Sequence, residues 1–202
     1  MDIGILGGTF DPLHVGHLRI AAEARVRLEL SRVLFVPAGQ PWLKADEAVA
    51  SPIHRVEMVK RAIADNPYFE LSTTEVDRPG PSYTVYTKAI LQQQLGAKAN
   101  FFFLLGWDSL AELPQWKEPG RLVQMCRLVA VPRMDFSPPN LEALESSVPG
   151  VTQSVVLLDM PLVGVSSSDI RKRVAQGLSI QGLVPDDVEE YIQEQKLYRQ
   201  GE

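Results

Sequence analysis

The sequence predicts an α/β fold: a doubly wound parallel sheet with a small helical part at its C-terminal end. Short apolar runs alternate with helical segments along the chain, a pattern typical of parallel sheets covered by helices on both faces. The run "NFFFLLG" at 100–106 is almost continuously apolar, as in a strand buried on both faces. The 202 residues are 45% hydrophobic and 22% charged, which suits a single domain over 1–202 with a helical subregion at 166–202.

Strands are expected where a short apolar run is followed by glycine, proline or polar residues. The first run ends at Gly7-Gly8, and Pro37 and Gly39 close the second. Because ligands of such sheets bind beyond the carboxyl ends of the strands, the residues after each strand are the first candidates for a site. In chain order, the expected strands are 2–6, 32–39, 68–78, 100–106, 127–133 and 155–160.

Helices are expected between these strands, where apolar residues recur at intervals of three and four. Ser51, Ser82 and Asp186 stand at positions where N-caps are expected. Residues 107–126 are expected to be helical with breaks at two prolines, and 134–150 to form a surface loop with a short helix. The other expected helices are 15–30, 51–66, 82–96, 166–177 and 185–198.

Charge and cysteine content exclude several classes of function. The net charge of -5 gives no broad basic surface, so no nucleic-acid or membrane partner is expected. Cys126 is the one cysteine; it can form no intrachain disulfide, and we expect a buried, inert thiol. The sequence opens without a leader pattern, and its most apolar run is too short to span a bilayer, so we expect a soluble, cytoplasmic protein. The sequence leaves open whether the protein forms a homo-oligomer.

The stretch "GILGGTFDPLHVGHLRIA" at the first strand has the composition of an anion site. Gly7 and Gly8 are expected to let the backbone turn sharply and approach a ligand, and Pro12 to fix the loop. His14 and His17 are three residues apart, so they share one face of the first helical turn, where unpaired amides and the helix dipole favour anions. The segment therefore predicts a phosphate site built from backbone amides and two imidazoles.

Other interpretations of this stretch fit less well. A Walker A loop would end in Gly-Lys-Ser/Thr, and no lysine lies here; the spacing is not G-x-G-x-x-G either. Zinc needs at least three protein ligands as a rule, and the remaining histidine, His54, falls in a different predicted helix. The structural alternative is a core-facing histidine pair beside a glycine turn.

The string "GGTFDPLHVGH" resembles the T/H-x-G-H signature of the nucleotidyltransferase superfamily, and nearly the whole chain resembles its nicotinate-nucleotide adenylyltransferase family. The resemblance continues through "HRVEMVKRAI", "GPSYTVYT", "LLGWDSLAELPQW" and "VGVSSSDIRKRV". It implies a Rossmann-like nucleotidyltransferase fold. It also implies transfer of the AMP part of ATP to nicotinate mononucleotide, which gives deamido-NAD and pyrophosphate in NAD biosynthesis. Mg²⁺ would accompany ATP with mostly water ligands, without metal-binding residues of the chain.

The resemblance implies roles for individual residues. Catalytic contacts to the phosphates are implied for His14, His17, Lys44 and Arg171. ATP binding is implied for Gly7, Gly8, Thr9, Phe10, His14, His17, Gly106, Asp108, Ser167, Ser168, Ile170 and Arg171. Mononucleotide binding is implied for Gly8, Thr9, Tyr83, Thr84, Asp108, Trp116 and Arg133. Leu43 stands where the family has a histidine.

Two other functions stay open. An enzyme similar to phosphopantetheine adenylyltransferase would share the first and the serine-rich motifs, but not the "SYT" and "GWD…W" segments. A non-catalytic nucleotide-binding regulator on the same fold would bind ATP without releasing pyrophosphate. Preference for the acid over the amide mononucleotide is implied by the resemblance alone. Arg55 has two interpretations, as a group that orients the loop after the second strand or as part of a surface ion pair.

Overall fold

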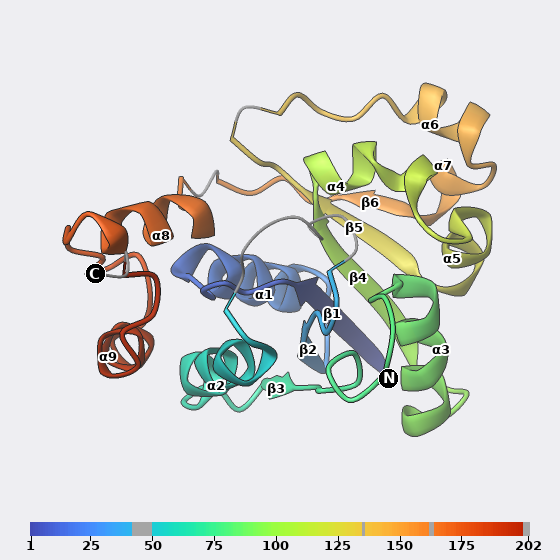
Figure 1. Ribbon diagram of the computed structural model, residues 1–202. Coiled ribbons are helices and arrows are strands. Elements are labelled where there is room, and N and C mark those ends of the chain that lie inside the picture. Colours follow the sequence, from blue (N-terminus) through green and yellow to red (C-terminus); the bar gives the residue numbers. More distant parts are fainter. Residues whose placement is uncertain (42–49, 135, 162–163, 200–202) are drawn as a thin grey trace.

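The computed structural model describes residues 1–41, 50–134, 136–161 and 164–199, and within them the strands form a six-stranded parallel sheet (Figure 1). The strands are β1 Asp2–Gly8, β2 Arg32–Pro37, β3 Phe69–Leu71, β4 Asn100–Gly106, β5 Arg127–Val131 and β6 Val155–Leu157. Their order is β3-β2-β1-β4-β5-β6, so the direction of winding reverses between β1 and β4. The predicted doubly wound parallel sheet is confirmed, and the reversal places a crevice at the carboxyl ends of these two strands.

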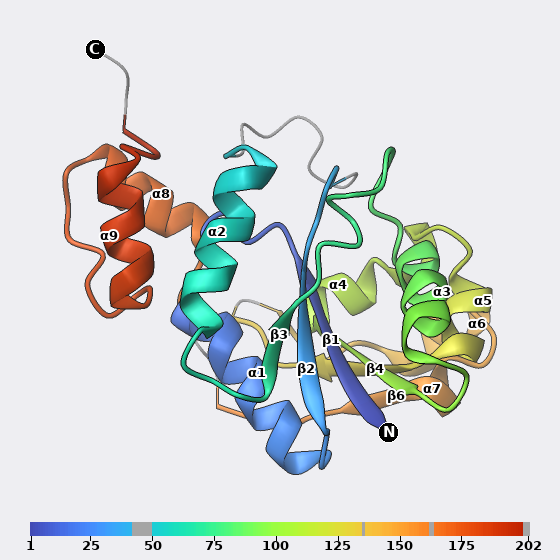
Figure 2. The same cartoon turned by 90° about the horizontal axis from the view of Figure 1, so that it is seen from below.

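Helices cover both faces of the sheet. Figure 2 shows α1 and α2 on one side and α3, α5, α6 and α7 on the other. Two core clusters match this division: one holds Ala21 and Val59 of the first pair, the other Leu91 and Leu122 of the second group. The helices are α1 Val15–Arg27, α2 Pro52–Ile63, α3 Thr84–Leu95, α4 Trp107–Ala111, α5 Pro119–Met125, α6 Leu141–Ser147, α7 Val151–Ser154, α8 Ser167–Ala175 and α9 Asp186–Glu194, with a 3-10 turn at Leu113–Gln115.

Strand β4 confirms the expectation of a strand buried on both faces. Phe101, Phe103 and Leu105 point into the cluster that includes α3 and α5, whereas Leu104 belongs to the cluster that includes α1 and α2. This division follows from the two-residue period of a strand. The rigid central strand ends at Gly106, directly at the crevice.

The C-terminal helices form a third cluster with α2. Met58 of α2, Ile170 of α8, and Val188 and Ile192 of α9 are all buried there. Figure 1 shows α8 and α9 side by side at one end of the molecule, next to the start of α1. This packing brings a helix from the end of the sequence to the loop that follows β1.

The third strand is much shorter than predicted. It ends at Leu71 rather than near residue 78, because Thr73 and Asp77 bond to each other and close a turn: the Asp77 amide donates to the Thr73 carbonyl at 2.9 Å, and the Thr73 hydroxyl to the Asp77 carboxylate at 2.6 Å. Ser82 is not the cap of the following helix. Tyr83 takes that position, and the Ser82 Oγ accepts hydrogen bonds from other amides instead.

Smaller differences occur at other boundaries. The sixth strand covers Val155–Leu157 instead of 155–160, and α9 begins at Asp186 with Pro185 as its N-cap, so the Asp186 carboxylate lies inside the first turn. Cys126 is buried, as expected, and burial raises the pKa of its thiol to about 12. None of the helices in the described ranges is long and apolar enough to cross a membrane.

Candidate active site

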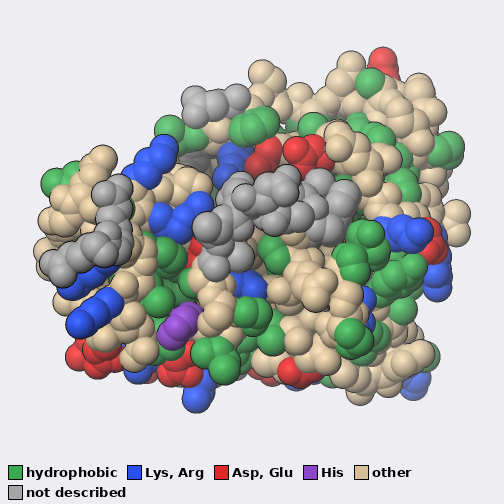
Figure 3. All heavy atoms as spheres, viewed as in Figure 1, with side chains coloured by type: hydrophobic (Ala, Val, Ile, Leu, Met, Phe, Trp, Pro, Cys, Tyr) green, Lys and Arg blue, Asp and Glu red, His purple; other side chains and the backbone are tan. Residues whose placement is uncertain are grey.

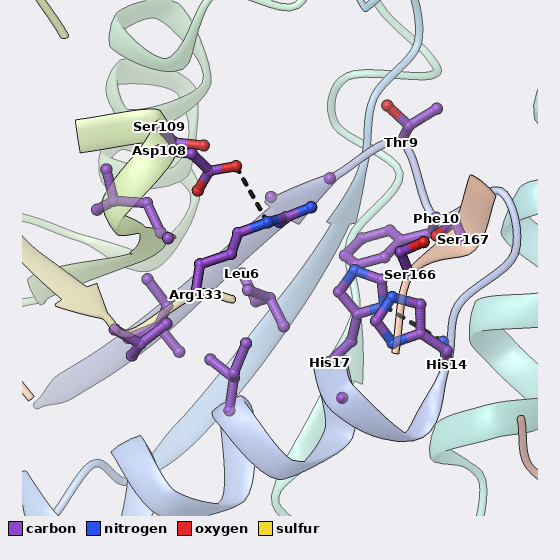
Figure 4. Close-up of a pocket in the computed structure, with 18 of the residues that line it drawn as sticks. Leu6, Thr9, Phe10, His14, His17, Asp108, Ser109, Arg133, Ser166 and Ser167 are labelled. Carbon is purple, nitrogen blue, oxygen red and sulfur yellow. Dashed lines mark hydrogen bonds and ion pairs between the residues drawn. The ribbon is translucent and has the colours of Figure 1, made fainter. Parts of the chain in front are cut away.

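A cleft of about 370 Å³ opens where the carboxyl ends of β1, β4 and β5 meet the first turns of α1, α3 and α8. Figure 4 shows Asp108 and Arg133 on one side of it and the two imidazoles on the other. Most of the residues implied by the sequence line this one space. They are Gly7, Gly8, Thr9, Phe10, His14, His17, Thr84, Gly106, Asp108, Trp116, Arg133, Ser167, Ser168 and Arg171.

Gly7 and Gly8 serve the cleft in a different way from the one predicted. Both still belong to β1 and pair in register with Val36 and Pro37 of β2, so the chain does not turn there. A Cβ on Gly8 would lie 3.0 Å from the Phe10 ring. These glycines therefore leave space for aromatic rings. The sharp turn falls at Phe10, whose φ of 51° is in the left-handed region.

The two histidines form a stacked pair at the start of α1. His14 is the N-cap residue and His17 the third helical residue, and their ring centroids are 3.7 Å apart. The His14 backbone N–H donates to Nδ1 of His17 at 3.2 Å. Because Nδ1 accepts, the proton of the neutral His17 ring lies on Nε2. Phe10 holds this ring edge-on at 5.0 Å, so its orientation is fixed from two sides.

Both imidazoles are neutral at neutral pH. Burial, followed by the positive charge of Arg133, lowers the pKa of His14 to about 4. Burial, followed by His14 and Arg133, holds the pKa of His17 well below its usual value. The pair can therefore donate hydrogen bonds to a bound anion without bringing positive charge of its own.

The start of α8 forms a second polar wall of the cleft. Ser166 caps the helix by accepting from the Asp169 amide at 3.1 Å, and the Ser167 hydroxyl donates to the Pro12 carbonyl at 2.9 Å. Arg171 lies one turn further on; its Nη2 donates to the Ser168 Oγ at 3.3 Å and its Nη1 to the Asp11 carbonyl at 2.8 Å. On the face seen in Figure 3, Lys and Arg side chains gather beside α8. The Ser168 hydroxyl, the helix start and the Arg171 guanidinium suit a phosphate group.

The end of β4 provides the opposite wall. A Cβ on Gly106 would lie 2.2 Å from Oδ1 of Asp108, so only glycine leaves this carboxylate its position. Asp108 Oδ2 pairs with Nε of Arg133 at 3.2 Å, and the Arg133 side chain is more than half exposed. Asp108 Oδ1 and the Trp116 Nε1 are buried and have no hydrogen-bond partner within the described residues. Both residues line the cleft.

Arg55 is a scaffold of the site, and its interpretation as a surface ion pair is wrong. The side chain is buried and donates to the carbonyls of Thr9, Ala38 and Ala50 at 2.7–3.0 Å. It thereby ties the loop after β1 to the loop after β2. Burial lowers the pKa of Arg55, and the negative charge of Asp11 opposes that shift.

Glu75 is a site residue that the sequence did not suggest. Its carboxylate is buried, lines the cleft and accepts from the Thr87 hydroxyl at 2.6 Å. Burial raises its pKa, and hydrogen bonds from Thr87 and Ser82 oppose the shift. Ser82 in turn accepts from the Gly39 amide at 2.9 Å, so these groups connect the start of α3 to the loop after β2. The "E" five residues before the "GPSYT" motif was the available signal.

Two implied residues of the described chain, Ile170 and Tyr83, are not among those that line the cleft. Ile170 is fully buried in the C-terminal cluster, where its side chain packs with Met58. Tyr83 is the N-cap of α3, and its ring lies edge-on to Tyr86 at 5.8 Å. Lys44 falls outside the described residues.

Comparisons with known proteins show which family the chain belongs to. A family model described as cytidylyltransferase-like matches residues 5–173. A probable nicotinate-nucleotide adenylyltransferase of Dehalococcoides mccartyi is 46% identical over 98% of this chain and 97% of that protein, and one of a Roseiflexus species is 47% identical over 98% of each. The chain belongs to the nicotinate-nucleotide adenylyltransferase family. It is a nucleotidyltransferase, as the resemblance in its sequence implied.

Solved structures support the same fold for this adenylyltransferase family member. Plasmodium falciparum nicotinic acid mononucleotide adenylyltransferase complexed with NaAD superimposes with a TM-score of 0.79 at 22% identity, over 98% of this chain and 97% of that one. The Rossmann-like nucleotidyltransferase fold is thereby confirmed. The cleft between β1 and β4 is where a ligand of this fold is expected.

Proposed function

We propose that the chain joins the AMP part of ATP to nicotinate mononucleotide and releases pyrophosphate, giving deamido-NAD. The observation that carries the proposal is that one cleft combines the His14–His17 pair with the serine–arginine wall of α8. Two phosphate-binding groups of this kind suit a triphosphate. The names of the relatives, probable nicotinate-nucleotide adenylyltransferases, support the choice of acceptor.

In the proposed reaction, a phosphate oxygen of the mononucleotide attacks the α-phosphorus of ATP in line. The new P–O bond forms as the bond to the β-phosphate oxygen breaks, and pyrophosphate leaves with the electron pair. The acceptor is already anionic, so no nucleophile of the protein is needed. Catalysis then depends on positioning and on stabilising the charge of the transition state.

The residues divide this work between them. His17 would donate from Nε2 to the α-phosphate and His14 would hold the neighbouring phosphates, since both rings are neutral and oriented. Arg171 would neutralise the departing pyrophosphate, with Lys44 as a second cation beyond the described residues. These donors need little reorganisation during the reaction because the loop and the helix starts already hold them.

The mononucleotide is assigned to the part of the cleft near α3 and β4. Trp116 lines the cleft and offers an aromatic face, and Thr84 begins α3, where amides would receive the nicotinate carboxylate. Tyr83 would contribute its amide at the same helix start. Asp108 would accept hydrogen bonds from a ribose.

Mg²⁺ would enter with ATP. In the described ranges, no group of three or more His, Cys, Asp or Glu residues could hold a metal ion by itself. The ion would be held by the phosphates of ATP and by water. The ion supplies neutralising charge on the phosphates when bound.

A pyrophosphate-release assay tests the proposal with ATP and one acceptor at a time: nicotinate mononucleotide, nicotinamide mononucleotide or phosphopantetheine. We expect the fastest release with nicotinate mononucleotide. Faster release with phosphopantetheine would support the alternative transferase. ATP binding without release for any acceptor would support the regulator.

A further inference from the structure

Asp11, in the loop between β1 and α1, is buried and contacts distant parts of the chain. The side chain is only 1% exposed. Its Oδ1 accepts from the Tyr198 hydroxyl at 2.7 Å and from the Ala50 amide at 3.2 Å. Its backbone carbonyl accepts from Nη1 of Arg171 at 2.8 Å. One residue of the loop after β1 thus links α8, the chain before α2 and the end of the sequence.

The two carboxylate oxygens of Asp11 have different surroundings. Oδ1 has two hydrogen bonds, whereas Oδ2 has no hydrogen-bond partner in the described part of the chain and lies 3.7 Å from Nη1 of Arg171. That distance is too long for a hydrogen bond. Arg171 is therefore attracted to the carboxylate but hydrogen-bonds to the Asp11 carbonyl, in an orientation that keeps it on the wall of the cleft.

Tyr198 contacts this carboxylate from a distant part of the chain. Its ring packs on the C-terminal cluster of Met58 and Ile170, which fixes the position of the hydroxyl. Burial, followed by the negative charge of Asp11, raises the pKa of Tyr198, so the hydroxyl remains a donor. The backbone of Tyr198 has a φ of 62°, and its neighbour Lys196 has 51°. A non-glycine residue keeps such a conformation where the surrounding contacts hold it.

We propose that Tyr198 is a positioning residue for the leaving phosphates of ATP. By binding Oδ1 it holds the Asp11 carboxylate in a rotamer that leaves Arg171 directed at the cleft. Without the hydroxyl, the carboxylate can rotate, form a full hydrogen-bonded pair with Arg171 and draw the guanidinium away from the ligand. The inference rests on the proposed function, in which Arg171 binds the pyrophosphate part of ATP.

The test compares Tyr198→Phe with Tyr191→Phe in the full chain. Tyr191 is a matched control, because its hydroxyl also bonds to a side chain, at 2.9 Å to Nδ1 of His54, between α9 and α2 and away from the cleft; the Tyr198 hydroxyl contacts Asp11 and, at 3.9 Å, the Met58 sulfur. Kinetic constants for ATP and for nicotinate mononucleotide and a melting temperature are measured for each variant. For Tyr198→Phe we expect kcat/KM for ATP to fall about tenfold, the effect of one hydrogen bond to a charged group. KM for the mononucleotide should change less than about twofold.

A double-mutant cycle with Asp11→Asn adds a second readout. The neutral amide attracts Arg171 much less, so Tyr198→Phe should cause little further loss in that background. The inference is overturned if Tyr198→Phe has the same kinetic constants as Tyr191→Phe. It is also overturned if kcat/KM of Tyr198→Phe falls equally for both substrates and the melting temperature falls with it. A wild-type chain that releases no pyrophosphate would overturn the proposed function as well, so the two failures are distinguishable.

Discussion

Replacing His17 with alanine removes an oriented donor from the wall of the cleft. Nδ1 of His17 is occupied by the His14 amide, so Nε2 is the atom that carries the proton toward a bound phosphate. Loss of one such preorganised donor costs about 2.7–4 kcal/mol of the barrier, which corresponds to a fall in kcat of at least about a hundredfold. KM for either substrate should change far less, because the contact strengthens in the transition state.

The alanine also removes an acceptor at the start of α1. The His14 amide would lose its partner at 3.2 Å, at a cost of about 1 kcal/mol of stability. His17→Asn separates the two effects, because an asparagine Oδ1 can replace Nδ1 as the acceptor while nothing replaces Nε2–H. We expect His17→Asn to melt near the wild-type temperature and still lose turnover.

Pyrophosphate release at saturating substrates measures kcat, and circular dichroism measures folding and melting. His54→Ala is the control, because His54 bonds to Tyr191 and is not among the residues that line the cleft in the described part of the chain. Turnover of His17→Ala within about threefold of the parent would remove His17 from the chemistry, because the expected effect is far larger.

Three further predictions concern other residues of the cleft. Trp116→Ala should raise KM for the mononucleotide about tenfold through the loss of ring stacking, with KM for ATP little changed. If both KM values equal those of the wild type, stacking on Trp116 is excluded. Gly106→Ala should lower kcat, since its Cβ would lie 2.2 Å from Oδ1 of Asp108, whereas Gly120→Ala has nothing within 4 Å and should be neutral in the same assay. Protonation of buried His14 opposes folding, because its pKa of about 4 lies below the unfolded value near 6.5. The free energy of unfolding should therefore have its full value above about pH 6.5 and fall as the pH is lowered toward 4, by up to about 1.4 kcal/mol per pH unit. Urea titrations over this range should show a weaker pH dependence of the unfolding free energy for His14→Gln.

The sequence by itself determined the fold class and predicted which loop lines the cleft. Alternating short strands and helices fix a parallel sheet, since a run such as 100–106 is apolar on both faces and needs helices on each side. The string that contains His14 and His17 predicted a phosphate site at the exit of the first strand, where the structure has a cleft lined by both imidazoles. These signals are local, because periodicity, caps and turn residues act over a few positions of the chain.

Only the tertiary structure decided which groups hold that loop in place. Tyr198 meets Asp11 across 187 positions, and Arg55 reaches the carbonyl of Thr9 across 46. Their roles depend on strand order and on burial, because a polar group enclosed by packing must find a partner wherever the fold provides one. The same cause explains Ser82. Serine is a common helix cap, but the Ser82 hydroxyl accepts from amides of the loop after β2 instead. Sequence patterns report the preference of each segment, whereas desolvation is a property of the assembled fold.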